Sequence, residues 1–157
     1  MEPKDFRDLI NVKIENNHGS ISFLDSIDFS AGIRLSGIVQ IADKVFISTT
    51  IFIILTIEHC TLCRLTRCLS QCVALYPEEA DRPAIGQGLN KLALITLKNI
   101  FCINKTTQEK EKEQVALQKF EERLVKSNVK TEAEFVSYDS DRGTWVFKVQ
   151  PLDKREF

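Results

Sequence analysis

A chain of 157 residues is about the length of one domain, and its composition, 43% hydrophobic and 27% charged, is that of an ordinary globular protein. The formal net charge of -1 excludes an overall basic character, so we expect no direct nucleic-acid partner. The N-terminal residues mix charged with apolar side chains and lack the apolar stretch of a secretory signal. This predicts an intracellular protein whose five cysteines are reduced.

The first predicted elements are a short helical turn that runs into a strand, within residues 5–14, and a returning strand at residues 20–24. Between them, Asn-Asn-His-Gly at residues 16–19 has the composition of a turn. His18 lies in this turn with no nucleophile near it in the sequence. We therefore interpret His18 as a turn residue and not as a catalytic base.

Residues 25–37 are interpreted as a connection, and strands are predicted at residues 38–41 and 73–76. The segment between these strands differs in composition, with four of the five cysteines and almost no acidic residues. Its apolar core, residues 45–57, is shorter than the roughly 20 apolar residues that a membrane-spanning helix needs. We expect no membrane insertion.

The same segment contains a metal-like spacing. Cys60 and Cys63 form a Cys-x-x-Cys pair, which is the usual half of a zinc site. The second half does not fit, because Cys68 and Cys72 are spaced like neighbours on a helix face and follow the first pair too closely. We interpret these thiols, with His59 beside them, as unligated, and expect no metal and no cofactor.

Gly-Gln-Gly-Leu-Asn at residues 86–90 precedes a predicted strand at residues 92–97. A lone Gly-x-Gly lacks the third glycine of a dinucleotide-binding motif and the Lys-Ser/Thr of a P-loop, so we interpret its glycines as turn residues. Cys102 follows in an apolar run and is expected to be a buried core residue.

A helix is predicted from residue 106 to about residue 128. Thr106 is the candidate N-cap and Glu109 its partner in a capping box. Apolar side chains at helical spacing then form a stripe that could cover a sheet: Val115, Leu117, Phe120 and Leu124.

Near the end of the chain, two strands joined by a short loop are predicted to form a hairpin in which Gly143 supplies a positive φ. Trp145 and Phe147 are its largest apolar side chains, and the helix is best placed to cover them. Strict alternation puts Phe135 and Tyr138 on opposite faces of the first strand. A two-stranded ribbon is not stable alone. The predicted fold class is therefore α+β, an antiparallel sheet of about six strands flanked by one or two helices.

The hairpin sequence at residues 134–149 and the motif at residues 86–90 resemble the autoproteolytic C-terminal domain of the large GLFG-repeat nucleoporins. The resemblance covers most of the chain, but residues 48–71 match nothing in that family. We therefore expect a single domain over residues 1–157 with an insertion at about residues 48–71.

In that family the last strand ends in His-Phe-Ser, where the chain cuts itself. The resemblance places Pro151 at the histidine, Leu152 at the phenylalanine and Asp153 at the nucleophilic serine. Self-cleavage needs a base and a hydroxyl nucleophile, and these degenerate positions supply neither. We expect no catalytic residue and no enzymatic activity.

The family domain also docks FG-repeat nucleoporins on the pore scaffold. The resemblance thus implies a docking domain in the nuclear pore complex of the nucleus, with scaffold nucleoporins as partners and a role in mRNA and protein transport. Two alternatives remain open. The chain is an active self-processing serine autopeptidase, or it is a fragmentary gene product without independent function.

Overall fold

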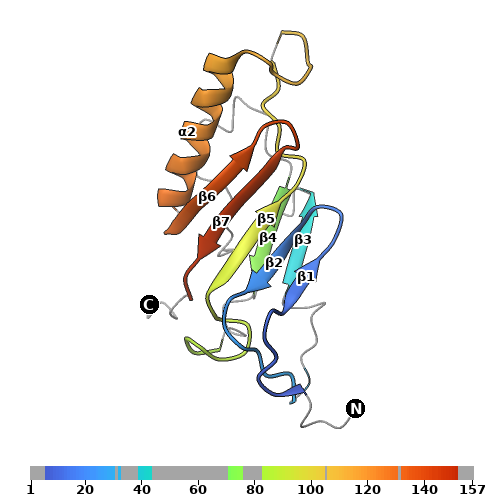
Figure 1. Ribbon diagram of the computed structural model, residues 1–157, viewed down its shortest axis with the longest axis vertical. Helices are drawn as coiled ribbons and strands as arrows, with labels where there is room; N and C mark the ends of the chain where they lie inside the picture. The colour runs from blue at the N-terminus through green and yellow to red at the C-terminus, as the bar shows by residue number, and fades with distance from the viewer. Residues whose placement is uncertain are drawn as a thin grey trace, which may run out of the picture.

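The computed structural model of the protein describes residues 6–30, 32, 39–43, 71–75, 83–104, 106–130 and 132–151. The strands are β1 (Lys13–Glu15), β2 (Gly19–Phe23), β3 (Val39–Asp43), β4 (Gln71–Leu75), β5 (Ala93–Leu97), β6 (Ala133–Asp139) and β7 (Thr144–Val149), and the helix is α2 (Gln114–Lys130) (Figure 1). The predicted α+β class is confirmed.

Five of these strands form one antiparallel sheet, in the order β1-β2-β5-β7-β6. The other two, β3 and β4, pair with each other as a separate antiparallel ribbon. In Figure 1, α2 lies beside β6 and β7, at the end of the sheet away from β1. The C-terminal hairpin, β6 and β7, is thus the part of the sheet that lies against the helix.

The strand register collects the large apolar side chains on one face of the sheet. Three cross-strand rows run over β2, β5, β7 and β6: Ile21, Ile95, Phe147 and Phe135 in the middle, Gly19, Leu97, Trp145 and Tyr138 on one side, and Phe23, Ala93, Val149 and Ala133 on the other. Residues two apart on a strand share a face, so the three rows lie together. This face forms the hydrophobic core.

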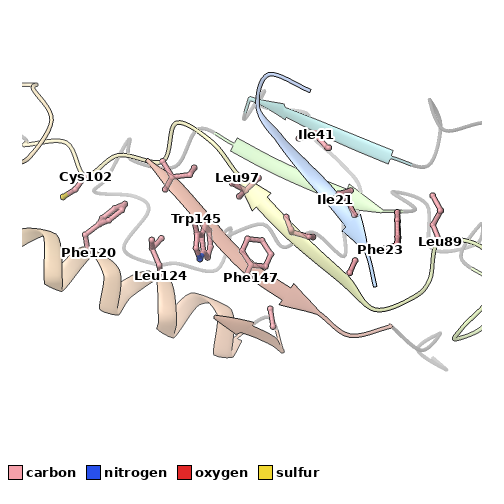
Figure 2. Close-up of a cluster of buried hydrophobic side chains, with 14 of the residues drawn as sticks. Ile21, Phe23, Ile41, Leu89, Leu97, Cys102, Phe120, Leu124, Trp145 and Phe147 are labelled. Atoms are coloured by element: carbon pink, nitrogen blue, oxygen red, sulfur yellow. The ribbon is translucent and has the colours of Figure 1, made fainter. Parts of the chain in front are cut away.

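The helix covers the part of that face that carries Trp145 and Phe147, as predicted. These two side chains are 2% and 1% exposed, and their rings contact each other with centroids 4.7 Å apart. Phe120 and Leu124 of α2 are buried in the same cluster (Figure 2). Ile41 of β3 also belongs to this cluster, so the separate ribbon shares the core of the sheet.

A β-bulge interrupts β6. The register with β7 shifts between Phe135 and Ser137, so Phe135 and Tyr138 both pack against the core while Val136 is 48% exposed. The prediction that Phe135 and Tyr138 lie on opposite faces is therefore wrong. A bulge adds one residue to one strand and restarts the alternation on the same face.

The turn of this hairpin has the predicted glycine geometry, with φ +62° at Gly143. A Cβ atom at this position would lie 2.6 Å from the ring of Phe101, so both the backbone and the space require glycine. The side chain of Asp139 closes the turn by accepting hydrogen bonds from the backbone N–H groups of Asp141 and Arg142, at 3.0 and 3.1 Å.

The turn between β1 and β2 is also confirmed. The side-chain oxygen of Asn16 accepts hydrogen bonds from the N–H groups of His18 and Gly19, at 2.9 and 3.2 Å. The helical turn predicted ahead of β1 is wrong for residues 7–12. There, Leu9 pairs with Ile27 through two backbone hydrogen bonds of 2.9 and 2.8 Å, which is extended and not helical geometry.

The helix begins at Gln114, later than predicted, and Thr106 is not its N-cap. The N–H groups of Thr106 and Thr107 donate instead to the side-chain oxygen of Asn104, at 2.9 and 3.2 Å. An asparagine that bonds to the backbone two and three residues on stabilises a turn, and this local alternative competes with helix formation. The predicted capping box with Glu109 is therefore wrong.

The strands predicted at residues 38–41 and 73–76 are confirmed as β3 and β4. Asp43 and Gln71 are Cα partners at the end of this ribbon, so the chain leaves β3 and re-enters β4 at neighbouring points. Apart from its last residue, Gln71, the predicted insertion lies outside the described residues, and so do the side chains of the cysteine cluster: Cys60, Cys63, Cys68 and Cys72, with His59.

Within the described ranges, no three His, Cys, Asp or Glu side chains come together in a way that could hold a metal ion. In the same ranges, no helix has the length and apolar character that crossing a bilayer requires.

Candidate functional site

The candidate site is the end of β7, where the sequence places the degenerate cleavage positions. The last paired residue of β7 is Val149, which lies between Ala93 of β5 and Ala133 of β6. Pro151 follows two residues later and is partly buried. Leu152 and Asp153 lie outside the described residues, so of the three positions the structure places only Pro151.

The pairing of β5 with β7 ends at Ala93 and Val149, so Lys91, in the stretch before β5, and Pro151 each lie two residues beyond the last pair. Lys91 is the ionisable residue of that stretch, and its ammonium group donates a hydrogen bond to the backbone oxygen of Ser26. This hydrogen bond ties the residues before β5 to the loop after β2.

Pro151 itself can neither accept a proton on its side chain nor donate a backbone hydrogen bond. A ladder that continued along β7 would lose one N–H donor at this residue. At residue 151 the chain therefore has a fixed φ and a side chain that cannot titrate.

The Gly-Gln-Gly-Leu-Asn turn supports the strand that flanks this site. Gly86 and Gly88 have φ values of +81° and +53°, which confirms their turn role. The N–H of Gly86 donates to the oxygen of Asn90 at 2.9 Å, and the N–H of Asn90 donates to the oxygen of Gln87 at 2.9 Å. Phosphate-binding loops need amide groups that point at the ligand, and these amides are already used within the turn.

Two buried asparagines fix elements around the core. The side-chain N–H of Asn90, 6% exposed, donates to the oxygen of Pro83 at 2.9 Å. Asn128 is 1% exposed and joins α2 to β7. Asn128 is not among the predicted core residues, although the sequence carries a signal for it: it continues the apolar helical spacing of Phe120 and Leu124 with a polar residue.

Two groups in the sheet have shifted pKa values. Hydrogen bonds from Lys13, at 2.8 Å, and from Lys98, at 2.7 Å, lower the pKa of Glu15 to about 2. Burial raises the pKa of Tyr138 to about 12, and its hydroxyl donates to the oxygen of Ile100 at 2.9 Å. Glu15 is exposed and Tyr138 holds a loop, so we assign both shifts to structure and not to catalysis.

Comparisons with known proteins agree with this geometry. The family model described as Nup98-96 autopeptidase S59 matches residues 55–152. Over 78 residues the chain is 44% identical to the nuclear pore complex protein NUP98A of Arabidopsis thaliana, covering 50% of this chain and 8% of that protein. Over 135 residues it is 30% identical to nucleoporin NUP116/NSP116 of Saccharomyces cerevisiae, covering 85% of this chain and 10% of that protein. The chain thus spans a small part of the length of these relatives.

Solved structures have the same fold. A chain of the yeast heterotrimeric Nup82-Nup159-Nup116 nucleoporin complex is similar with a TM-score of 0.65 and 25% identity, over 96% of this chain and 86% of that chain. The C-terminal domain of nuclear pore complex component NUP116 from Candida glabrata is similar with a TM-score of 0.58 and 23% identity, over 96% of this chain and 80% of that chain.

Proposed function

The chain belongs to the Nup98-96 autopeptidase S59 family of nucleoporins, and on this basis we propose that it is a docking domain of the nuclear pore complex that does not cut itself. Its partners are scaffold nucleoporins, and its place is the nuclear pore, where it supports transport between nucleus and cytoplasm. The observation that carries the proposal is the likeness, over 96% of this chain, to a chain of a complex of three nucleoporins.

The absence of cleavage is supported by the residue types at the end of β7. Pro151 stands where the family resemblance places the histidine base, and Asp153 stands where it places the serine nucleophile. An acyl shift to a hydroxyl requires both a hydroxyl and a group to take its proton. Asp153 has no hydroxyl, and Pro151 has no side chain that can take a proton, so the nucleophile and the base of this route are both missing at these positions.

The fold of the proposed docking domain does not depend on those residues. The register that builds the sheet ends at Val149, and the core is completed by Trp145 and Phe147 of the same strand. A change at Pro151 and beyond therefore removes the chemistry without removing any of the buried side chains that hold the sheet to α2. The fold that would present a docking surface is therefore kept without the tripeptide.

Two measurements test docking. A fluorescent fusion of the full chain, expressed in Saccharomyces cerevisiae, is expected to mark the nuclear rim. Purified chain is expected to co-elute with purified yeast Nup82, the first-named component of the similar complex. The variant Trp145→Ala, which empties the core, serves as the unfolded control and should do neither. Diffuse fluorescence together with separate elution of the wild-type chain would overturn the proposal.

A further inference from the structure

One flank of α2 carries three cations, Lys119, Arg123 and Lys126. They are four and three residues apart, and with 3.6 residues per turn they fall within about 60° of the helix circumference and about 10 Å of its length. We refer to these three residues as the basic stripe. The stripe is distinct from the buried side of the helix, which carries Phe120, Leu124 and Asn128.

The cations of the basic stripe have no anionic partner among the described residues. Lys119 and Lys126 are exposed, and Arg123 is partly exposed. The guanidinium of Arg123 donates only to the backbone oxygen of Lys119, at 3.3 Å, and lies 5.7 Å from the ring centroid of Phe120. The ion pairs of the described part of the chain all lie elsewhere, on the sheet and in the hairpin turn.

Repulsion between the charges of the basic stripe lowers the stability of α2. Lys119 and Arg123 are like charges at i and i+4, and Arg123 and Lys126 are like charges at i and i+3. Such pairs are neighbours on a helix surface and repel each other, which lowers helix stability. Glu122, three residues after Lys119 and four before Lys126, offsets part of this repulsion, but the ion pairs of the described residues include none with the three cations. An anion from outside the chain would offset the rest.

We propose that the basic stripe binds an extended acidic segment of a partner protein, with carboxylates at alternate positions. The inference rests on the proposed docking function and names the chemistry of one contact. Alternate side chains of an extended chain are about 6.6–6.8 Å apart, close to the about 6 Å that separates Lys119 from Arg123 along the helix axis. Two carboxylates of one strand face can therefore meet two cations of the stripe.

The surroundings favour a peptide over a nucleic acid. The chain as a whole has a net charge of -1, so it offers no extended positive field to a polyanion. Glu122 lies one turn from both Lys119 and Lys126 and bounds the stripe on one side. A short segment with separated carboxylates avoids Glu122, whereas a continuous phosphate backbone would be repelled along its length.

The test uses the full chain and a fluorescent 12-residue peptide in which glutamate alternates with threonine. Fluorescence anisotropy compares the wild type with the neutralised variant Lys119→Gln/Arg123→Gln/Lys126→Gln. The matched control, Lys13→Gln/Lys98→Gln/Lys148→Gln, removes the same charge from cations of the sheet that already have carboxylate partners. We expect the neutralised variant to bind roughly tenfold more weakly, the control to bind as the wild type does, and wild-type affinity to fall with added salt.

Stability gives a second readout. The neutralised variant loses the two like-charge pairs of the stripe and also the attraction of Lys119 and Lys126 to Glu122, so its melting temperature should change little although its binding is weaker. A clearly lower melting temperature would show that the stripe serves the fold, and it would overturn the inference. Equal binding of the peptide by both triple variants would also overturn it, as would tight binding of a 12-nucleotide oligouridylate with none of the peptide.

The same variants separate this inference from the docking function. If wild-type chain co-elutes with Nup82 and the neutralised variant does so equally well, docking stands and the basic stripe is not its contact. If wild-type chain does not bind Nup82, docking fails, and the acidic peptide alone then decides whether the basic stripe is a binding surface.

Discussion

The indole N–H of Trp145 donates a hydrogen bond to the side-chain oxygen of Asn128, at 3.2 Å, in the buried space between β7 and α2. The contact joins two residues that are 17 positions apart and connects the last strand to the helix that covers it. Apolar packing alone tolerates small shifts of a helix on a sheet. A buried hydrogen bond fixes the position of the helix relative to the strand.

Removal of this acceptor should therefore destabilise the protein. In Asn128→Ala the indole N–H is left buried without an acceptor, and we expect a loss of about 1–3 kcal/mol in the free energy of unfolding, measured by urea denaturation. Val129→Ala, on the exposed side of the same helix, is the control and should change stability by less than about 0.5 kcal/mol. Equal stability of the two variants would show that the bond contributes nothing.

Gly86 and Gly143 both lie in turns with a positive φ, but the space beside Gly86 is empty and the space beside Gly143 is filled, so the two form a matched pair. A Cβ at Gly86, φ +81°, meets no atom within 4 Å, whereas a Cβ at Gly143, φ +62°, meets the ring of Phe101 at 2.6 Å. Gly86→Ala should cost only the backbone strain, about 1 kcal/mol, and Gly143→Ala clearly more. Thermal denaturation measures both. If Gly86→Ala lowers the melting temperature more than Gly143→Ala does, the contact with Phe101 is not what makes glycine necessary at residue 143.

Alkaline pH should weaken the fold through Tyr138. Its pKa is raised to about 12 by burial, above the ordinary value of 10.0. The folded state therefore holds the phenolic proton more tightly than the unfolded state. This contribution to stability is complete below pH 10 and is lost as the pH rises from 10 to 12. Urea denaturation between pH 9 and pH 12 should show the decline in the wild type and a smaller one in Tyr138→Phe. Parallel curves would contradict the assignment.

The chain should remain intact on prolonged incubation. Intact-mass spectrometry is expected to show the full-length mass alone, because Pro151 provides no base and Asp153 no hydroxyl. Asp153→Ser alone should also stay uncut. Pro151→His/Leu152→Phe/Asp153→Ser, which restores base and nucleophile together, should yield a product that ends at residue 152. The same product from the wild-type chain would contradict the proposed loss of activity.

If residues 48–71 are an insertion, as predicted, then the connection between β3 and β4, residues 44–70, can be replaced. Asp43 and Gln71 are antiparallel Cα partners, and a two-residue turn of Asn-Gly is sufficient to join such a pair. The shortened chain is expected to unfold cooperatively and to keep its binding to Nup82. Loss of the cooperative transition, measured by circular dichroism, would show that the segment is an integral part of the domain.

The hairpin and the covering helix could be predicted because their signals are local. Trp145 and Phe147 alternate along one strand, and Phe120 and Leu124 recur at helical spacing. The bulge could not be predicted, because an extra residue in a strand does not change the composition that suggests a strand. Its position depends on the pairing with β7, which is a property of two segments together.

The helix start and the candidate site show a different limit. Thr106 fits a capping motif, but the backbone N–H of Thr106 donates to the side-chain oxygen of Asn104 instead. The sequence alone does not show which of these competing hydrogen bonds forms. The positions at residues 151–153 can be identified only by resemblance to the family, because proline, leucine and aspartate form no recognisable catalytic motif by themselves. Asn128 could have been found as a polar residue in an apolar stripe, but its partner Trp145 is visible only in the fold.

The bulge in β6 has a consequence for solubility. Within the described residues β6 is the outermost strand beside β7, and an outer strand with an uninterrupted ladder is a template on which other chains can add. The register shift next to Val136 breaks that ladder in its middle, and the charged Glu134 lies on its surface. The interrupted ladder and the charge of Glu134 thereby disfavour the addition of another chain and the growth of fibres along this strand.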